Sequence, residues 1–289
     1  MGRIEKLWVE NFRINLESNN FSKSNVKALR YVINTFPTKL NKKTIILVGA
    51  GPSLDENLQL LEQVQNSAII LSSDVVAPTL IRNNIKPDFI CTVDPHETIP
   101  NILSSIADIP IIAPVTTNPL LFKSFKGNIY LFNPIDEVKE KNELLMSLNE
   151  KAPQMSYIYN SLFVGGNCLQ ISSIFKPEKV LLLGYDLAFT NNKVYCEGVL
   201  EDRFKISSYA TKEEFEQALL STSIIYSGIK TSKLFIIYAK MFMRLVQGSK
   251  LKVINCSKGS LLTQLPYRPL EDFKEEFKQK ISKSKLKNY

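Results

Sequence analysis

The residues best suited to chemistry are a carboxylate and the one histidine of the chain, which stand together in Asp94-Pro95-His96-Glu97. They follow the apolar run 89–93, so we expect them at the C-terminal end of a strand. A carboxylate there could hold Mg²⁺ against phosphates, act as a general base or orient a sugar hydroxyl. A single histidine excludes a poly-histidine metal site, and a histidine base in this chain must be His96. The non-catalytic alternative is an exposed loop histidine, with Glu97 as the neighbouring carboxylate that could pair with it.

A second candidate site is the turn Gly49-Ala50-Gly51-Pro52-Ser53, which follows four consecutive apolar residues. Such a run is typical of a strand buried on both faces of a parallel sheet. The glycines permit a tight turn and close backbone approach, and Pro52 and Ser53 suit the first turn of a helix. Together these features predict a phosphate-binding site. Leu54 replaces the third glycine of the dinucleotide fingerprint, which favours a single nucleotide over NAD. The alternative is an ordinary strand–helix turn.

Further candidates for the same site follow other apolar runs. Asp74 stands where nucleotide-binding sheets commonly contact a ribose hydroxyl, although it could instead cap a helix. The remaining candidates are Gly165, Gly166 and Asn167, which open a helix, and Gly184 and Asp186, which follow the run 180–183. Because the C-terminal ends of parallel strands meet at one edge of a sheet, we predict that these residues gather around one nucleotide.

Alternating strands and helices must position these residues. Apolar runs predict strands at 45–48, 68–71, 89–93, 111–113, 129–132, 180–183 and 252–256, with helical spacing between most of them. This alternation predicts an α/β fold, with a Rossmann-like, doubly wound, mainly parallel sheet and added N-terminal and C-terminal helices.

The domain organisation follows from the same pattern. Residues 1–43 are predicted to form an N-terminal helical extension with two helices. Residues 44–265 form the nucleotide-binding catalytic domain, in which 190–250 is a lid or helical insertion. Residues 136–155 are predicted to be helical, and 211–247 to form one helix or a pair. Residues 266–289 form a basic C-terminal helix or tail.

Composition narrows the class of protein. The 289 residues are 44% hydrophobic and 22% charged, which is ordinary for a soluble globular protein. Part of the net charge of +8 lies in the lysine-rich C-terminus, whose contact with an anionic membrane surface is a minor alternative. No module of interleaved basic and aromatic residues is present, so we expect no nucleic-acid partner.

Other motifs exclude several enzyme classes and suggest a location. The chain has no Gly-x-Ser-x-Gly elbow, Walker lysine motif or His-Glu-x-x-His, which weighs against serine hydrolases, P-loop enzymes and zinc proteases. Its four widely spaced cysteines predict buried thiols in a reducing compartment. No signal-peptide core or membrane-length apolar run is present, so the expected location is the cytoplasm.

Three motifs together resemble one known family: Val48-Gly49-Ala50-Gly51-Pro52-Ser53-Leu54; Asn84-Ile85-Lys86-Pro87-Asp88 with Val93-Asp94-Pro95; and Gly184-Tyr185-Asp186-Leu187-Ala188. The region 44–260 resembles the domain shared by motility accessory factor proteins and 6-hydroxymethylpterin diphosphokinase-like proteins, the domain of unknown function 115. Val253-Ile254-Asn255-Cys256-Ser257-Lys258-Gly259 resembles the motility-factor branch.

The motility-factor branch implies a glycosyltransferase that moves a nonulosonic acid from a CMP-activated donor to a protein or glycan hydroxyl, such as one on flagellin. Its glycine turn is also similar to that of bacterial sialyltransferases that use CMP-sialic acid. The resemblance implies that residues 49–53 bind CMP, with Asp74 near the ribose, and that Asp94 or His96 is the catalytic base. No metal or other cofactor is required. The late histidine base of those sialyltransferases has no counterpart, because no histidine follows His96.

The pterin branch implies a different reaction. It resembles thiamine pyrophosphokinases, in which acidic residues hold Mg²⁺–ATP, and the matching carboxylates here are Asp74, Asp88 and Asp94. The long 190–250 region and the N-terminal helices favour the glycosyltransferase-like branch. A third hypothesis is a nucleotide-binding protein that acts in assembly without catalysis.

Overall fold

The protein is built on one nine-stranded sheet. The computed structural model describes residues 3–35, 44–104, 106, 108–135, 155–205 and 207–278. The strands lie in the order β1 (Val26–Ala28), β6 (Ile129–Ile135), β5 (Ile111–Pro114), β4 (Phe89–Cys91), β3 (Ile69–Ser73), β2 (Thr44–Val48), β8 (Lys179–Leu183) and β11 (Val253–Asn255), and β7 (Ser156–Tyr159) also pairs with β6. Every pair in this sheet is parallel. The predicted α/β class is confirmed.

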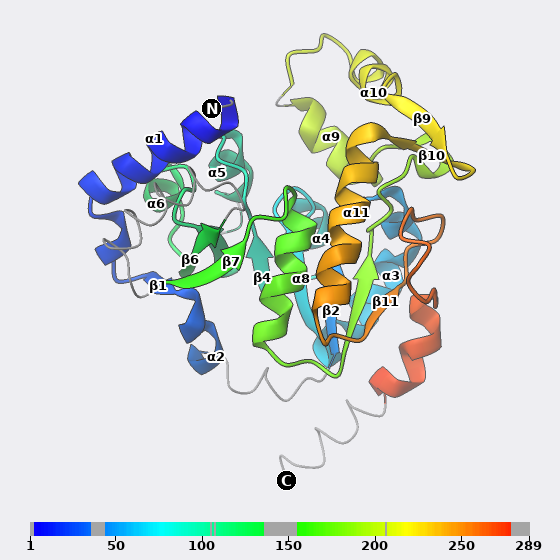
Figure 1. Cartoon of the computed structure of the whole chain (residues 1–289), viewed down its shortest axis with the longest axis horizontal. Helices are drawn as coiled ribbons and strands as arrows, with labels where there is room; N and C mark the ends of the chain where they lie inside the picture. The colour runs from blue at the N-terminus through cyan, green and yellow to red at the C-terminus, as the bar shows by residue number, and fades with distance from the viewer. Residues whose placement is uncertain are drawn as a thin grey trace.

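Helices cover both faces of the sheet (Figure 1). Their bounds are α1 Arg3–Glu17, α2 Val32–Thr35, α3 Leu58–Val64, α4 Ala77–Arg82, α5 Thr98–Leu103, α6 Leu121–Ser124, α8 Val164–Ile174, α9 Glu197–Lys205, α10 Lys212–Leu220 and α11 Lys233–Gly248. A separate antiparallel hairpin, β9 (Ser223–Tyr226) with β10 (Ile229–Ser232), precedes α11. α8 and α11 cover one face of the sheet, where Leu169 and Phe242 join the core. α3 and α4 cover the other face with Leu61 and Leu80.

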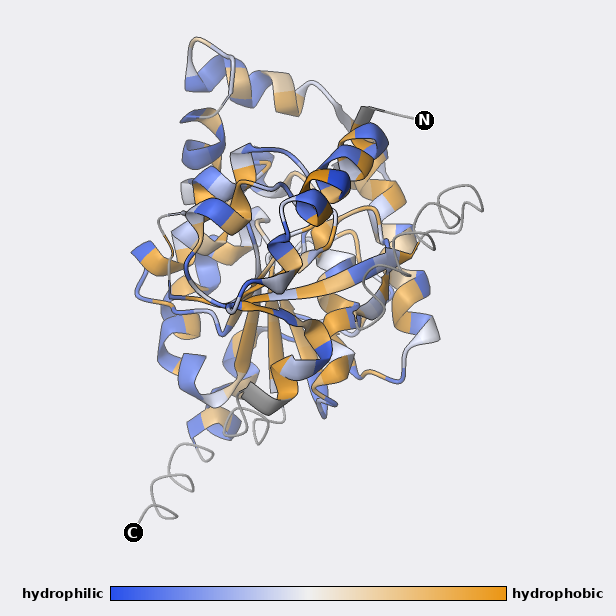
Figure 2. Ribbon diagram, turned by 90° about the vertical axis from the view of Figure 1, so that its left-hand side faces the viewer, coloured by the Kyte–Doolittle hydropathy of each residue, from blue (hydrophilic) through white to orange (hydrophobic). Residues whose placement is uncertain are grey.

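The strand order creates a topological switch point between β2 and β8. From β2 the chain moves outward through β3, β4, β5 and β6, and then returns to add β8 and β11 on the other side of β2. Val48 lies beside Leu183 at the ends of these two strands. Connections leave β2 and β8 in opposite directions, so a crevice opens above them, which is the usual ligand position in open α/β sheets. Figure 2 shows the apolar strands enclosed between helices whose outer faces are polar.

Two local predictions are corrected by the structure. The second N-terminal helix begins later than its apolar pattern indicates: Val26–Ala28 form the edge strand β1, which pairs with Ile129–Leu131 of β6, and the helix α2 spans Val32–Thr35. The predicted helical region 211–247 contains the β9–β10 hairpin between its two helices. In each case strand pairing outweighs a local hydrophobic pattern that is too short to determine the secondary structure.

The N-terminal helix is bound to loops at the C-terminal edge of the sheet. The buried Asn11 of α1 donates to the carbonyl of Pro95 at 3.0 Å, and the buried Asn15 donates to the carbonyls of Val115 and Thr117 at 3.1 and 2.9 Å. α1 therefore fixes the backbone of the loop that carries Asp94 and His96.

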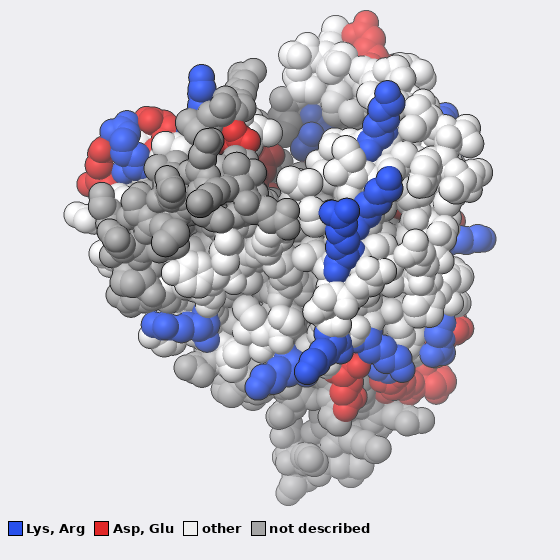
Figure 3. Space-filling model, viewed as in Figure 1, with Lys and Arg blue, Asp and Glu red and all other residues white. Residues whose placement is uncertain are grey.

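The distribution of charge is visible on the face that α11 crosses. Figure 3 shows Lys and Arg side chains over this helix, which carries Lys233, Lys240 and Arg244 and no acidic residue. Residues 279–289 of the basic tail and the predicted helix at 136–154 lie outside the described residues. Among the helices that the structure describes, none is long and apolar enough to cross a membrane.

Candidate functional site

A cavity of about 190 Å³ opens at the switch point between β2 and β8. Six chain segments meet there, and the glycines and alanines that line it are Gly49, Ala50, Gly51, Gly165, Gly184 and Ala188. Its wall also contains five aromatic residues, Phe163, Tyr185, Tyr195, Phe235 and Tyr238. Phe163 and Tyr238 stack with ring centroids 4.8 Å apart. A small cavity lined by aromatic rings suits a planar ring system.

The glycine turn is shaped by its contact with the turn after β8. The N–H groups of Gly49 and Gly51 donate to the carbonyls of Leu183 and Gly184, both at 2.8 Å. A Cβ on Gly49 would lie 2.6 Å from the Gly184 oxygen, and Gly184 itself has φ +67°, so the two turns approach too closely for side chains. The N–H of Ser53 also has a partner, and Pro52 has no N–H. Among residues 49–53, Ala50 therefore carries the one N–H without a partner in the described protein.

Asp186 links these two turns through hydrogen bonds. Its carboxylate accepts hydrogen bonds from the N–H of Ser53 at 3.0 Å, the hydroxyl of Ser53 at 2.6 Å and the hydroxyl of Thr190 at 2.7 Å. The side chain is 1% exposed, and burial raises its pKa. The cavity lining does not include Asp186, Ser53 or Pro52. These three predicted nucleotide ligands therefore lie behind the turns that line the cavity.

Of the predicted ligands Gly165, Gly166 and Asn167, only the first lines the cavity. Gly165 lines the cavity in the first turn of α8, which begins directly after Phe163. In the same turn, the N–H of Gly166 donates to the carbonyl of Phe163 at 3.2 Å. Gly166 packs against Ser161, where a Cβ would lie 2.6 Å from the Ser161 hydroxyl. Asn167 accepts a hydrogen bond from that hydroxyl at 2.5 Å and donates to the carbonyl of Tyr159. Thus Gly166 and Asn167 shape the loop before α8.

At the end of β3, Ser73 lines the cavity, whereas the predicted ligand Asp74, which follows it, does not. Both oxygens of Asp74 accept hydrogen bonds, from the N–H of Val75 at 2.8 Å and the hydroxyl of Thr92 at 2.7 Å. The carboxyl is buried, and burial raises its pKa to about 6. Ser73 is 4% exposed and lines the cavity, and its hydroxyl has no partner in the described protein. A buried hydroxyl without a partner is unfavourable, so it is a natural contact for a ligand.

The raised pKa of Asp74 predicts a pH-dependent gain in stability for Asp74→Asn. The folded pKa of about 6 exceeds the ordinary 3.8, so the folded state loses stability as pH rises between these values and remains less stable above them. The asparagine amide oxygen can accept the Val75 N–H, and its NH2 group can donate to the Thr92 hydroxyl, without the buried charge. We expect the variant to be more stable than the wild type by about 2–3 kcal/mol at pH 8 and by almost nothing near pH 4. Urea unfolding at both pH values measures this, and an equal difference at both would contradict it.

Asp94 and His96 form a close pair on the same edge, in the loop after β4. The Asp94 carboxylate accepts the backbone N–H of His96 at 2.9 Å, and its Oδ1 lies 2.5 Å from His96 Nδ1. The side chains are 40% and 44% exposed, so a substrate can reach them. The loop itself is fixed, because the carbonyl of Pro95 accepts hydrogen bonds from Asn11 and Asn118. Glu97, the other predicted partner of the histidine, forms no ion pair among the described residues.

Asp88 does not belong to this edge. Its carboxylate accepts the N–H of Ile70 at 2.9 Å, at the start of β3, whereas Asp74 follows the end of that strand. The prediction that Asp88 joins Asp74 and Asp94 in holding Mg²⁺–ATP is therefore wrong. Within the described ranges no group of three or more His, Cys, Asp or Glu side chains is arranged to hold a metal ion. The four cysteines are buried and unpaired, as predicted.

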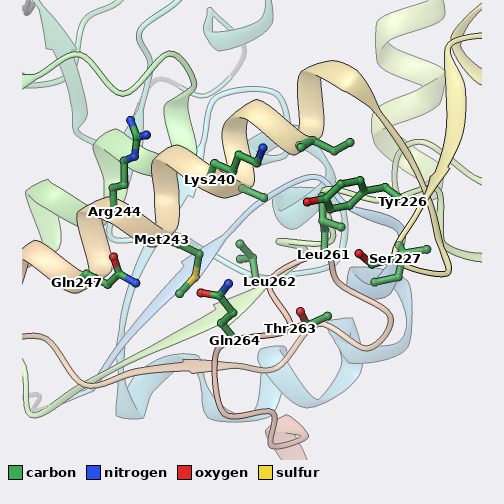
Figure 4. A pocket seen from close by; sticks show the side chains of 13 residues that line it. Tyr226, Ser227, Lys240, Met243, Arg244, Gln247, Leu261, Leu262, Thr263 and Gln264 are labelled. Carbon is green, nitrogen blue, oxygen red and sulfur yellow. The ribbon is translucent and has the colours of Figure 1, made fainter.

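Several residues of the site carry no signal in the sequence pattern. The aromatic rings of Phe163, Tyr195 and Tyr238 and the hydroxyl of Ser73 come from separate segments, and no local motif joins them. A second pocket, of about 360 Å³, lies between α11, the turn of the β9–β10 hairpin and residues 261–264 (Figure 4). It is lined by Lys240 and Arg244 and by no carboxylate or histidine. The switch-point cavity is likewise lined by no carboxylate or histidine, and the Asp94–His96 pair lies outside both pockets, in the loop after β4.

The solved structure of another protein agrees with this fold. The structure of the MAf glycosyltransferase from Magnetospirillum magneticum AMB-1 aligns with a TM-score of 0.57 and 17% identity, covering 84% of this chain and 37% of that one. The chain thus spans little more than a third of that relative's length. The sialyltransferase CstII from Campylobacter jejuni, solved with the substrate analogue CMP-3FNeuAc, aligns with a TM-score of 0.33 and 14% identity, covering 78% of this chain and 86% of that one. No curated protein matches the sequence.

The sequence also matches one family directly. Residues 16–192 match the 6-hydroxymethylpterin diphosphokinase MptE-like family. The matched region begins within α1 and ends just after the turn that carries Gly184 and Asp186, so it contains both turns of the switch point and the Asp94–His96 pair. It covers more than half of the chain and confirms the resemblance found in the motifs, so this protein belongs to the 6-hydroxymethylpterin diphosphokinase MptE-like family.

Proposed function

We propose that the protein is a nucleotide-dependent transferase, and specifically a glycosyltransferase that moves a nonulosonic acid from a CMP-activated donor to a protein or glycan hydroxyl, such as one on flagellin. The observation that carries this proposal is the Asp94–His96 pair, at 2.5 Å, on the same sheet edge as the aromatic cavity of the switch point. One part of the site can bind a nucleotide, and the other can accept a proton.

The donor would occupy the cavity with its base and extend across the sheet edge with its phosphate and sugar. The cavity of about 190 Å³ is smaller than most complete ligand sites, which measure about 300–1,000 Å³, so it suits only the ring of a nucleotide. The ring would lie against the tyrosine and phenylalanine side chains and meet the hydroxyl of Ser73. The N–H of Ala50, which has no partner among the described residues, and the N-terminus of α8 would provide donors for anionic groups.

The Asp94–His96 pair would act as the base. With Nδ1–H donating to Asp94, the other ring nitrogen of His96 is free to accept the proton of the acceptor hydroxyl. The hydroxyl oxygen forms a bond to the anomeric carbon, the bond from that carbon to the CMP phosphate oxygen breaks, and the electron pair leaves with CMP. Asp94 orients the imidazole and stabilises its protonated form.

The fold relative supports a transferase of this general type. That relative is a glycosyltransferase, but at 17% identity the likeness concerns the fold alone, so donor and acceptor rest on the site and on the motif resemblance. We place the reaction in the cytoplasm, where the four buried thiols would remain reduced.

A second candidate function is a pyrophosphokinase that transfers a diphosphate from Mg²⁺–ATP to a pterin-like alcohol. The family match favours this candidate, because the description of the family names that activity. Mg²⁺ usually binds through one or two carboxylates together with phosphates. Asp94 would provide the accessible carboxylate, while both oxygens of Asp74 already accept hydrogen bonds.

Calorimetric titration with CMP, CTP, ATP and GTP, each with and without Mg²⁺, distinguishes the candidates. The glycosyltransferase proposal expects CMP to bind without a requirement for Mg²⁺. Binding of Mg²⁺–ATP alone would overturn it in favour of the pyrophosphokinase. If no nucleotide binds, both enzyme functions fail and a structural role in assembly becomes the better explanation.

A further inference from the structure

The helix α9, in the region predicted to be a lid, is anchored to the glycine turn. The N–H of Cys196 donates to the carbonyl of Ala50 at 2.9 Å, and the N–H of Glu197 donates to the Asp55 carboxylate at 3.2 Å. Further along, Asp202 pairs with Arg82 of α4 at 2.7 Å. These contacts fix both ends of α9 over the C-terminal edge of the sheet.

Arg203 differs from the other basic residues around α9. Its guanidinium carbon lies 5.8 Å from the ring centroid of Tyr195, which lines the cavity. Arg82 and Lys205 each form an ion pair with Asp202, at 2.7 and 3.6 Å. Arg203 is only partly exposed, and it has no ion pair or hydrogen bond to any side chain that the structure describes. Its five N–H donors are therefore available to a ligand.

The negative charges around the site also favour a cation at the position of Arg203. Asp74 and Asp94 both lie at the edge where the phosphate of a bound nucleotide would emerge. The charge of Asp94 raises the pKa of Asp74 and that of Arg203 lowers it, so both groups lie within electrostatic reach of Asp74. Without a neighbouring cation, the two carboxylates would repel an entering phosphate.

We propose that Arg203, held against Tyr195, forms an anion subsite that binds the phosphate of the nucleotide. The planar fork of arginine matches phosphate oxygens bidentately, and the tyrosine face limits the orientations of the guanidinium. The subsite rests on the proposed function for the identity of its ligand. In that reaction Arg203 would stabilise the charge that develops on the phosphate as CMP departs.

The test compares nucleotides with nucleosides on the full chain. Binding of CMP, cytidine, Mg²⁺–ATP and adenosine is measured by calorimetry for the wild type, Arg203→Ala, Arg203→Lys and Lys205→Ala. For whichever nucleotide the wild type binds, we expect Arg203→Ala to weaken it about 10- to 100-fold and to leave the matching nucleoside unchanged. Arg203→Lys should restore part of the loss. Lys205→Ala, an exposed basic residue on the same helix, should behave as the wild type.

The outcomes separate the subsite from the proposed function. An equal loss of nucleotide and nucleoside affinity in Arg203→Ala overturns the subsite, because the residue would then act only on the shape of the cavity. Unchanged CMP affinity in this variant also overturns it and leaves the glycosyltransferase proposal intact. If the wild type binds Mg²⁺–ATP but not CMP, the glycosyltransferase proposal fails, and a selective loss of ATP in Arg203→Ala still supports the subsite.

Discussion

Replacement of His96 by glutamine is expected to lower the rate of sugar transfer by about 10²- to 10⁴-fold, with little change in nucleotide affinity. Glutamine retains a polar side chain of similar size but cannot accept a proton from the acceptor hydroxyl. Release of CMP from a CMP-activated nonulosonic acid in the presence of acceptor measures the rate, and calorimetry with CMP measures binding. Asp94→Asn should lose less activity, because the imidazole remains and only its orientation and stabilisation suffer.

Glu97→Gln is the matched control for this experiment. Glu97 stands next to His96 and is exposed, but the ion pair of the histidine is with Asp94. The same loss of charge at Glu97 should therefore leave transfer unchanged. A His96→Gln variant with wild-type transfer would contradict the assignment of the base, while leaving the nucleotide site untouched.

Gly51→Ala is expected to destabilise the fold by about 2–4 kcal/mol. The backbone of Gly51, with φ −68° and ψ 154°, would accept alanine without strain. The added methyl group, however, would stand 2.6 Å from Asp186 Cγ and 2.7 Å from the Gly184 oxygen. Either the Asp186 carboxylate moves and loses its hydrogen bonds to Ser53, or β2 and β8 separate at their ends.

Urea unfolding of Gly51→Ala and Gly248→Ala tests this explanation. At Gly248, the last residue of α11, a Cβ would meet no atom within 4 Å, so alanine there should be neutral or slightly stabilising. A neutral Gly51→Ala variant would mean that the contact between the two turns is not close, and the account of the glycine pair would have to be abandoned. Thermal unfolding with CMP then reports whether the cavity survives the substitution.

The sequence by itself determined the fold class and the edge of the sheet at which the candidate residues gather. Long apolar runs such as 45–48 and 180–183 predict buried parallel strands because few other structures can bury four consecutive apolar residues on both faces. The polar residue that follows each run must then lie at the C-terminal edge. The positions of Asp74 and Asp94 could be predicted for this reason.

Only the tertiary structure decided what each of these residues contacts. The pairing of β2 with β8 brings together two turns separated by more than 130 residues of chain, and no local pattern encodes that contact. It occupies the amides of Gly49 and Gly51 and the carboxylate of Asp186, which sequence motifs assign to a nucleotide. The cavity wall and Arg203 likewise depend on how α8, α9 and α11 pack. Strand identity follows from local burial, whereas ligand contacts depend on distant segments that meet only after the sheet has assembled.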